Sequence, residues 1–129
     1  MPHETFERLE MRTDDYAKPI TILLDNQPIG LFVLDYGNDK FEMTANENAL
    51  LLRSLSINPL YQGKGYGKVA MLLIDNFVKE NFLTINELVL AVNFKNKAAY
   101  DLYVKVGYID DGLQREWHNG MQHLLKKKL

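Results

Sequence analysis

Three strand-like runs precede any helical pattern in this chain, and that order limits the possible folds more than any other feature. Residues 20–24 and 29–34 are rich in β-branched and aliphatic side chains, and the segment between them has the turn chemistry of a hairpin. A third apolar run covers residues 49–57. Three consecutive strands predict a meander and disfavour a doubly wound parallel sheet, in which strands alternate with helices from the start.

The period of the apolar residues then changes from that of a strand to that of a helix. Apolar side chains at three- and four-residue spacing predict a helix from about Tyr66 to Asn81. The side chains expected on its core side are Tyr66, Val69, Ala70, Leu73, Ile74 and Phe77. A buried strand is predicted at residues 88–92, and the two strands joined through this helix are expected to lie parallel.

The last third of the chain predicts a second helix and a closing hairpin. Residues 97–106 have helical spacing, with Asn96 as a suitable N-cap and Gly107 just beyond the end. Two strand-like runs, residues 108–117 and 121–125, then flank an Asn-Gly pair, which is a strong turn signal. These strands are expected to pair antiparallel.

Size and composition are typical of a globular protein with one packed core. The chain has 129 residues, of which 47% are hydrophobic and 25% charged, so we expect a single domain over residues 1–129. A formal net charge of -2 argues against a nucleic-acid partner, because such proteins usually carry a basic excess. The three lysines at residues 126–128 are expected to form a solvated, frayed tail.

Two absences from the sequence narrow its chemistry and its location. Without cysteine the chain has no disulfide, no thiolate metal site and no cysteine nucleophile. No window approaches the ~20 apolar residues of a membrane span, and the first residues lack the apolar core of a signal peptide. The sequence therefore predicts a cytoplasmic protein that does not enter the membrane.

A glycine-spaced turn, NPLYQGKGYGKV at residues 58–69, connects the third strand to the first helix. Gly63, Gly65 and Gly67 allow positive φ values and a close approach of the backbone to a ligand. The turn also opens a helix, whose first N–H groups lack internal partners, and two lysines add positive charge. The pattern fits an anion site, although a tight connector without any ligand needs glycine as well.

Two familiar nucleotide motifs fit this turn poorly. No Gly-Lys-Ser or Gly-Lys-Thr ending is present, so the magnesium-binding hydroxyl of a Walker loop is missing. The glycine spacing is GxGxG and not GxGxxG, and a meander precedes it, which disfavours a dinucleotide site of the Rossmann type.

The turn resembles the acetyl-CoA motif of the GCN5-related N-acetyltransferase (GNAT) family. That motif reads Gln or Arg, two variable residues, Gly, one variable residue, then Gly or Ala, and residues 62–67 (QGKGYG) match it completely. A second family pattern, Asn followed by an Ala-containing helix with a Leu-Tyr pair and a final Gly-Phe, is similar to residues 96–108 (NKAAYDLYVKVGY). Only Tyr108 replaces the commoner Phe.

The resemblance implies an α+β fold (an α/β three-layer arrangement), in which a mixed, mostly antiparallel sheet has helices on both faces. Family members usually have a strand and two helices before the first hairpin, and these helices help to wall the acceptor site. Residues 1–19 are too few for all three, although they have room for an initial strand or a short helix around residues 6–11.

The resemblance also implies which residues bind the donor, acetyl-CoA. The strand before the turn is expected to give backbone hydrogen bonds to the pantetheine arm, and the turn is expected to surround the pyrophosphate. The expected contacts are Leu55, Ile57, Gln62, Gly63, Lys64, Gly65, Gly67, Lys68 and Asn96. Asn93 is a further candidate.

The implied reaction is direct attack of a neutral amine on the acetyl thioester, which suits a chain without cysteine. Tyr103 occupies the family's general-acid position and would protonate the departing thiolate. The alternative is a core tyrosine on the apolar stripe of its helix. The sequence identifies no base; the possible bases are Asp35, Glu42, Glu47, His118 and His123, and the histidines have no metal-site spacing.

The leading hypothesis is thus an acetyl-CoA-dependent N-acetyltransferase acting on the primary amine of a small molecule or a peptide. A second hypothesis is a non-catalytic acyl-CoA-binding module, which the short N-terminal region favours and Tyr103 opposes. A third is a nucleotide-binding protein that uses the glycine turn. An exposed edge strand could also support a homodimer.

Overall fold

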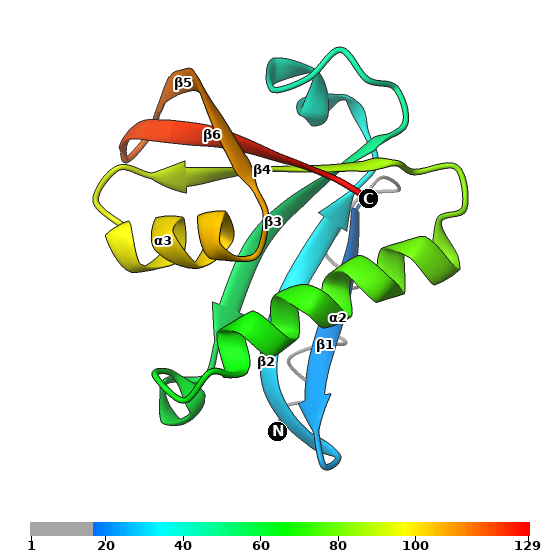
Figure 1. The fold of residues 1–129 in the computed structure, drawn as a ribbon, viewed down its shortest axis with the longest axis vertical. Helices are drawn as coiled ribbons and strands as arrows, with labels where there is room; N and C mark the ends of the chain where they lie inside the picture. Colours follow the sequence, from blue (N-terminus) through cyan, green and yellow to red (C-terminus); the bar gives the residue numbers. More distant parts are fainter. Residues whose placement is uncertain (1–16) are drawn as a thin grey trace.

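The computed structural model describes residues 17–129, which form one six-stranded sheet with the order β1-β2-β3-β4-β6-β5 (Figure 1). The elements are β1 (Ala17–Leu24), β2 (Gln27–Asp35), the 3-10 helix η1 (Asn38–Glu42), β3 (Ala49–Ile57), the 3-10 helix η2 (Pro59–Tyr61), α2 (Tyr66–Asn81), β4 (Glu87–Asn93), α3 (Lys97–Lys105), β5 (Ile109–Trp117) and β6 (Gly120–Lys128).

The predicted meander and the predicted parallel pair are both confirmed. β1, β2 and β3 pair antiparallel, β3 pairs parallel with β4, and β6 pairs antiparallel with β4 and β5. Asp25 and Asn26 turn the first hairpin with φ values of 51° and 65°, a region that Asp and Asn tolerate better than most residues. The mixed, mostly antiparallel sheet expected from the sequence is therefore present.

α2 and α3 pack on the same face of the sheet (Figure 1). Their apolar side chains join a core on the strands beneath that includes Leu50, Leu88 and Leu125, all 0% exposed. On the other face a smaller cluster contains Leu51 and Val89, and the segment with η1 adds Met43, which is buried. Within residues 17–129, helical segments thus lie on both faces, with α2 and α3 together on one.

The buried side of α2 differs from the predicted side. Val69 and Leu73 are 52% and 50% exposed, whereas the residues that α2 buries are Ala70, Met71, Ile74, Asp75 and Val78. All six residues from 69 to 74 are apolar, so their period alone does not fix the rotation of the helix.

No helix was predicted between the strand-like runs 29–34 and 49–57, where η1 lies. The Lys40 side chain is buried here, and its Nζ donates hydrogen bonds to the carbonyl oxygens of Glu47 (2.6 Å) and Ala49 (2.9 Å). A lysine that holds a loop through backbone oxygens leaves no periodic apolar pattern, which explains why the element was missed.

The prediction of a frayed lysine tail at residues 126–128 is wrong. β6 continues to Lys128 and pairs with β4 as far as Glu87. The Lys127 side chain is only 16% exposed, because it forms an ion pair with the buried Asp75 of α2. The possible element around residues 6–11 lies outside the described residues. None of the helices within residues 17–129 is long and apolar enough to cross a membrane.

Candidate active site

The glycine turn between β3 and α2 is open to solvent. Gly63 and Gly65 have φ values of 75° and 84°, which disfavour residues with a Cβ atom. A Cβ atom built on either residue would meet no heavy atom within 4 Å. The backbone conformation, and not crowding, therefore requires glycine here, and the surface of the turn is left free for a ligand.

The turn leads directly into the N-terminus of α2. Gly65 is the N-cap residue, and no side chain of the described residues caps this end of the helix. The first intrahelical hydrogen bond runs from Val69 N–H to the Gly65 carbonyl, so the N–H groups of residues 66–68 have no intrahelical partner. Lys64 and Lys68 are exposed beside them. This end of α2 has the donors and the positive charge that an anion needs.

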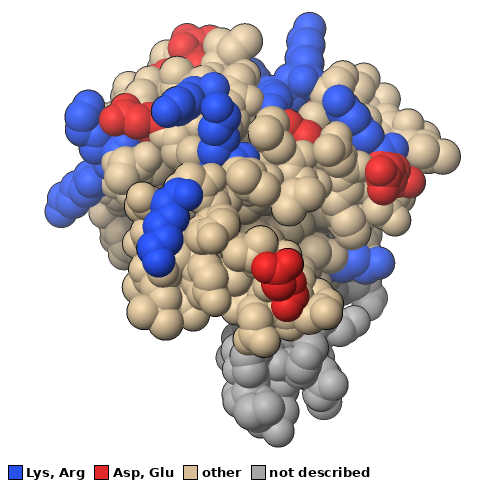
Figure 2. Space-filling model, turned by 60° about the horizontal axis from the view of Figure 1, so that its bottom comes forward, with Lys and Arg blue, Asp and Glu red and all other residues tan. Residues whose placement is uncertain are grey.

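The charge around the turn extends toward α3. Figure 2, in which the bottom of Figure 1 comes forward, shows Lys and Arg side chains gathered on its left side, where the turn and α3 lie in Figure 1. Lys97 and Lys105 belong to α3, and Lys95 precedes it. The surface beside the turn is therefore mainly basic, although the net charge of the chain is negative.

Two polar side chains hold the turn in place. Asn58 Oδ1 accepts a hydrogen bond from Leu60 N–H (3.0 Å), and Gln62 Nε2 donates one to the carbonyl oxygen of Ile57 (2.8 Å). Gln62, an expected coenzyme contact, thus has a role of its own in joining the turn to the end of β3.

β3 and β4 separate next to this turn. Only Ala49–Leu51 of β3 pair with Glu87–Val89 of β4, although both strands continue further. Figure 1 shows the two strands diverging beyond these pairs. The free part of β3 contains an irregularity, because its register with β2 shifts and Ser54 has a φ of 59°. The sheet is therefore open at its centre.

The backbone of β3 faces this gap at two expected contact residues. Asn58 N–H donates to the carbonyl oxygen of Ile29 in β2 (2.7 Å). Amide groups alternate in direction along a strand, so those of Ile57 and Leu55 point away from β2 and into the gap. An extended chain lying in the gap would find an unpaired strand edge here.

The two family-like motifs meet where α2 starts. A Cβ atom built on Gly67 would lie 3.1 Å from Leu102 Cδ2 of α3, so this glycine lets the two helices pack closely. Gly67, an expected coenzyme contact, therefore has a packing reason of its own. Asn96 caps α3, because its Oδ1 accepts a hydrogen bond from Ala99 N–H (3.2 Å).

Tyr103 follows Leu102 and is 9% exposed. Burial raises the pKa of its hydroxyl above the ordinary value of 10.0. Its ring packs beside that of Tyr108, with centroids 5.9 Å apart, and its hydroxyl has no hydrogen bond to another residue of the described part of the chain. A phenol on a largely buried ring that stays protonated and has no partner among the described residues suits a proton donor.

The other candidate side chains are engaged elsewhere or lie apart. Asn93 donates to the Asn119 carbonyl (3.0 Å) and accepts from Lys95 N–H (2.8 Å), which ties the end of β4 to the last hairpin. His123 stacks on Phe94 with centroids 4.1 Å apart. Neither contact needs a ligand.

Among the acidic candidates, Asp35 forms an ion pair with Arg53 (3.5 Å), and Glu47 is exposed. His118 lies beside Trp117 on the closing hairpin. No three His, Asp or Glu side chains within residues 17–129 are grouped as a metal would need.

Sequence reasoning missed a cavity of about 290 Å³ on the η1 face of the open sheet. Among its lining residues are Asp39 and Glu42 of the η1 segment and Arg115 and Trp117 of β5. These residues are more than 70 positions apart in the sequence, as the hydrogen bond from Arg115 to Glu42 illustrates, so no local pattern joins them. The chain's single tryptophan was the one available signal.

Comparison with known proteins agrees with this arrangement. The model of the acetyltransferase (GNAT) family matches residues 1–108. An N-acetyltransferase of Bacillus subtilis (strain 168), named YbbJ and described as uncharacterized, is 39% identical over 126 residues, which cover 97% of this chain and 78% of that protein.

Solved structures share the fold at low sequence identity. The aminoglycoside acetyltransferase AAC(6')-Ib in complex with coenzyme A is 17% identical with a TM-score of 0.74, covering 88% of this chain and 67% of that one. The PaiA N-acetyltransferase of Thermoplasma acidophilum, also in complex with coenzyme A, is 21% identical with a TM-score of 0.63, covering 88% and 62%. The family match and the B. subtilis relative together show that this chain belongs to the GNAT family of acetyltransferases, whose reaction is acetyl transfer to an amine.

Proposed function

We propose that this protein transfers the acetyl group of acetyl-CoA directly to a primary amine of its acceptor. The observation that carries the proposal is the open edge of β3, which lies between the glycine turn and the helix with Tyr103. A phosphate site, a strand edge and a buried acid are the three parts that such a transfer needs.

The glycine turn is proposed to hold the pyrophosphate of the donor. The free N–H groups at the start of α2 would donate to its oxygens, and Lys64 and Lys68 would add charge. Gln62, Gly63, Gly65 and Gly67 shape this turn. Relatives of the same fold were solved with coenzyme A, which supports this assignment.

The gap beside β3 is proposed to take the pantetheine arm. The amide groups of Leu55 and Ile57 would pair with this arm as a neighbouring strand would, although the Ile57 oxygen already accepts from Gln62. Asn96, at the start of α3, is proposed as a further contact. A backbone N–H directed at the thioester oxygen would stabilise the oxyanion; one such donor is typically worth ~10²-fold in rate.

Tyr103 is proposed as the general acid. The neutral amine attacks the thioester carbon, a tetrahedral intermediate forms, and the carbon–sulfur bond breaks. The thiolate takes the Tyr103 proton, the new amide nitrogen releases its extra proton to solvent, and the Tyr103 phenolate takes a proton back from solvent. The raised pKa of Tyr103 keeps this proton in place at neutral pH until the leaving group needs it.

We further propose the class of the acceptor, the location of the protein and a surface for a second copy. AAC(6')-Ib has been solved with ribostamycin and coenzyme A, which supports a small-molecule amine as acceptor. We expect residues 1–129 to act as one domain in the cytoplasm. β5 is an edge strand with Ile109 65% exposed, and it offers a surface for a second copy.

Binding of coenzyme A tests the donor site. Gly65→Glu should abolish binding measured by titration calorimetry, because it adds a negative charge and a side chain where φ is positive. Gly112→Glu is the matched control, because Gly112 also has a positive φ (92°) and open space but lies on β5. Equal affinity in the Gly65→Glu and Gly112→Glu proteins would reject the donor site.

Turnover of acetyl-CoA with a panel of amines tests the acid. Tyr103→Phe should bind coenzyme A normally and transfer about 10²-fold more slowly. Tyr100→Phe, on the same helix, serves as the control and should keep the normal rate. Full activity of the Tyr103→Phe protein would show that the phenol has a packing role only. Absence of transfer in every protein, including the wild type, would favour the alternative of a non-catalytic acyl-CoA-binding module.

A further inference from the structure

Tyr103 and Tyr108 form a pair of neighbouring phenols at the end of α3. Their ring centroids lie 5.9 Å apart with an interplanar angle of 59°, and Tyr108 N–H donates to the Tyr103 carbonyl oxygen (3.0 Å). Both residues are largely buried, with 9% and 2% of their surface exposed. Tyr108 is thus held against the residue that we propose as the general acid.

The Tyr108 hydroxyl is buried and forms no hydrogen bond within residues 17–129. A buried hydroxyl without a partner destabilises a fold, because it has lost its hydrogen bonds to water and gained none in exchange. Phenylalanine, which has the same ring without the hydroxyl, would fill the space without that cost. Packing alone therefore does not explain why this chain has a hydroxyl here.

Two charged groups lie beside Tyr108. Lys127 Nζ is 5.9 Å from the centroid of the Tyr108 ring and forms an ion pair with the buried Asp75. Burial, then the Asp75 carboxylate and then Tyr103, raise the pKa of Tyr108 far above its ordinary value. For Tyr103 the cause of the raised pKa is burial. The two environments therefore assign different roles: Tyr103 releases its proton more readily, and Tyr108 keeps its own.

We propose that Tyr108 is a positioning residue whose hydroxyl stabilises the Tyr103 phenolate during acetyl transfer; this rests on the proposed function. When Tyr103 gives its proton to the departing thiolate, a negative charge forms on the oxygen of a largely buried ring. The Tyr108 hydroxyl keeps its proton and has no other partner among the described residues, so it can turn its O–H dipole toward this charge. The interaction is strong because burial keeps water from screening it, and it ends when the phenolate takes a proton back from solvent.

A double-mutant cycle tests whether Tyr108 acts through Tyr103. The rate of acetyl transfer is measured in single turnovers, which report the chemical step, for the wild type, Tyr108→Phe, Tyr103→Phe and the double variant. The acceptor is the amine of the panel that the wild type acetylates fastest. We expect Tyr108→Phe to slow the wild type about tenfold, as expected for a lost hydrogen bond to a charged group. It should change the rate of the Tyr103→Phe protein by less than about twofold, because no phenolate forms there.

Two further measurements separate this role from a structural one. Tyr108→Phe should leave the urea midpoint unchanged or raise it, because it removes an unpartnered buried hydroxyl, and it should leave the affinity for coenzyme A unchanged. Tyr100→Phe is the matched control, because it removes a hydroxyl of α3 that bonds to Asp110 (2.6 Å), and it should keep the normal rate. Equal slowing by Tyr108→Phe in both backgrounds, or no slowing of the wild type, would overturn the proposal.

Failure of this proposal can be distinguished from failure of the proposed function. A slow Tyr103→Phe protein together with a normal Tyr108→Phe protein would retain the acid and refute only the role of Tyr108. Full activity of the Tyr103→Phe protein would refute Tyr103 as the acid, and the role of Tyr108 with it. Absence of transfer to any amine by the wild type would refute both the proposed transfer and this role.

Discussion

Lys127 of β6 and Asp75 of α2 form an ion pair whose side chains are only 16% and 9% exposed. The same Lys127 ammonium donates a hydrogen bond to the Val106 carbonyl oxygen (2.6 Å), just after the end of α3. One side chain thus joins α2, α3 and β6. α2 begins at the proposed donor site and α3 contains Tyr103, so the ion pair helps to hold the candidate active site together.

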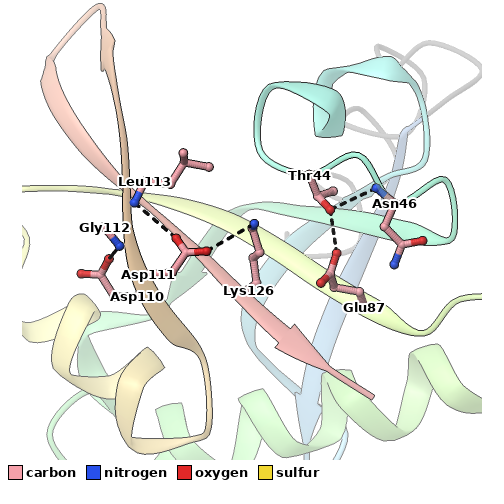
Figure 3. A network of polar contacts seen from close by, with 8 residues as sticks. All are labelled: Thr44, Asn46, Glu87, Asp110, Asp111, Gly112, Leu113 and Lys126. Carbon is pink, nitrogen blue, oxygen red and sulfur yellow. Dashed lines mark hydrogen bonds and ion pairs between the residues drawn. The ribbon is translucent and has the colours of Figure 1, made fainter.

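Removing one partner of this ion pair should lower the free energy of unfolding. Lys127→Met leaves the Asp75 carboxylate buried without its cation, and we expect a loss of about 3 kcal/mol in the free energy of unfolding measured in urea. Lys126→Met is the control, because Lys126 pairs with the half-exposed Asp111 (3.5 Å; Figure 3), and it should cost less than about 1 kcal/mol. Adding Asp75→Leu to Lys127→Met should recover part of the loss. Equal stability of the two lysine variants would contradict a buried ion pair.

The elements that the sequence predicted well are those with a strong local pattern. Residues 49–57 form one unbroken strand run, and residues 66–81 keep a helical period, so both elements were predicted with their observed bounds. The rotation of α2 was not predictable in the same way, because Leu72 and Leu73 are apolar and yet 46% and 50% exposed. Lys127 was misjudged because Asp75, 52 residues earlier, determines its environment.

The candidate site likewise has parts that a local sequence motif reveals and parts that depend on contacts between distant residues. The turn with Gly65 and the helix with Tyr103 are contiguous motifs, which a sequence can display. Glycine at position 67 is also needed for the close packing of α2 on α3, and this need depends on Leu102, a residue of another helix. The η1-face cavity brings Asp39 together with Trp117, and nothing in the sequence near either residue indicates the other.

Because Gly67 lies close to Leu102, the effect of Gly67→Ala on stability should depend on the residue at position 102. Alanine is favoured over glycine in a helix by about 1 kcal/mol, but here its Cβ atom would lie 3.1 Å from Leu102 Cδ2. We expect Gly67→Ala to destabilise the wild-type protein by about 1 kcal/mol, since crowding of this kind typically costs more than the helix gains. In a Leu102→Ala background the same change should stabilise the protein. Urea unfolding of the four proteins measures both effects, and the same sign in both backgrounds would rule out the contact as the cause.

The contacts of Asp110 in β5 should make the stability of the folded protein depend on pH. Its Oδ2 accepts a hydrogen bond from the Tyr100 hydroxyl (2.6 Å), and its Oδ1 accepts one from Gly112 N–H (2.9 Å; Figure 3). The Tyr100 hydrogen bond, then the Gly112 hydrogen bond, lower the pKa of this carboxyl group; burial opposes them, and nearby His123 adds a small attraction. Because the pKa is lower in the folded state, the stabilisation is complete above the ordinary value of about 4 and is lost as the pH falls through the folded value.

Tyr100→Phe removes the largest cause of this lowered pKa and should flatten the pH dependence. We expect the melting temperature of the variant to lie below that of the wild type at pH 6, and the difference to shrink as the pH falls below about 4, where both forms protonate. In an Asp110→Asn background no charge can form at this position, so Tyr100→Phe should shift the melting temperature by the same amount at every pH. Thermal unfolding of the four proteins between pH 3 and 6 measures this, and a Tyr100 effect that is independent of pH in the native Asp110 background would show that the hydrogen bond does not favour the charged carboxylate.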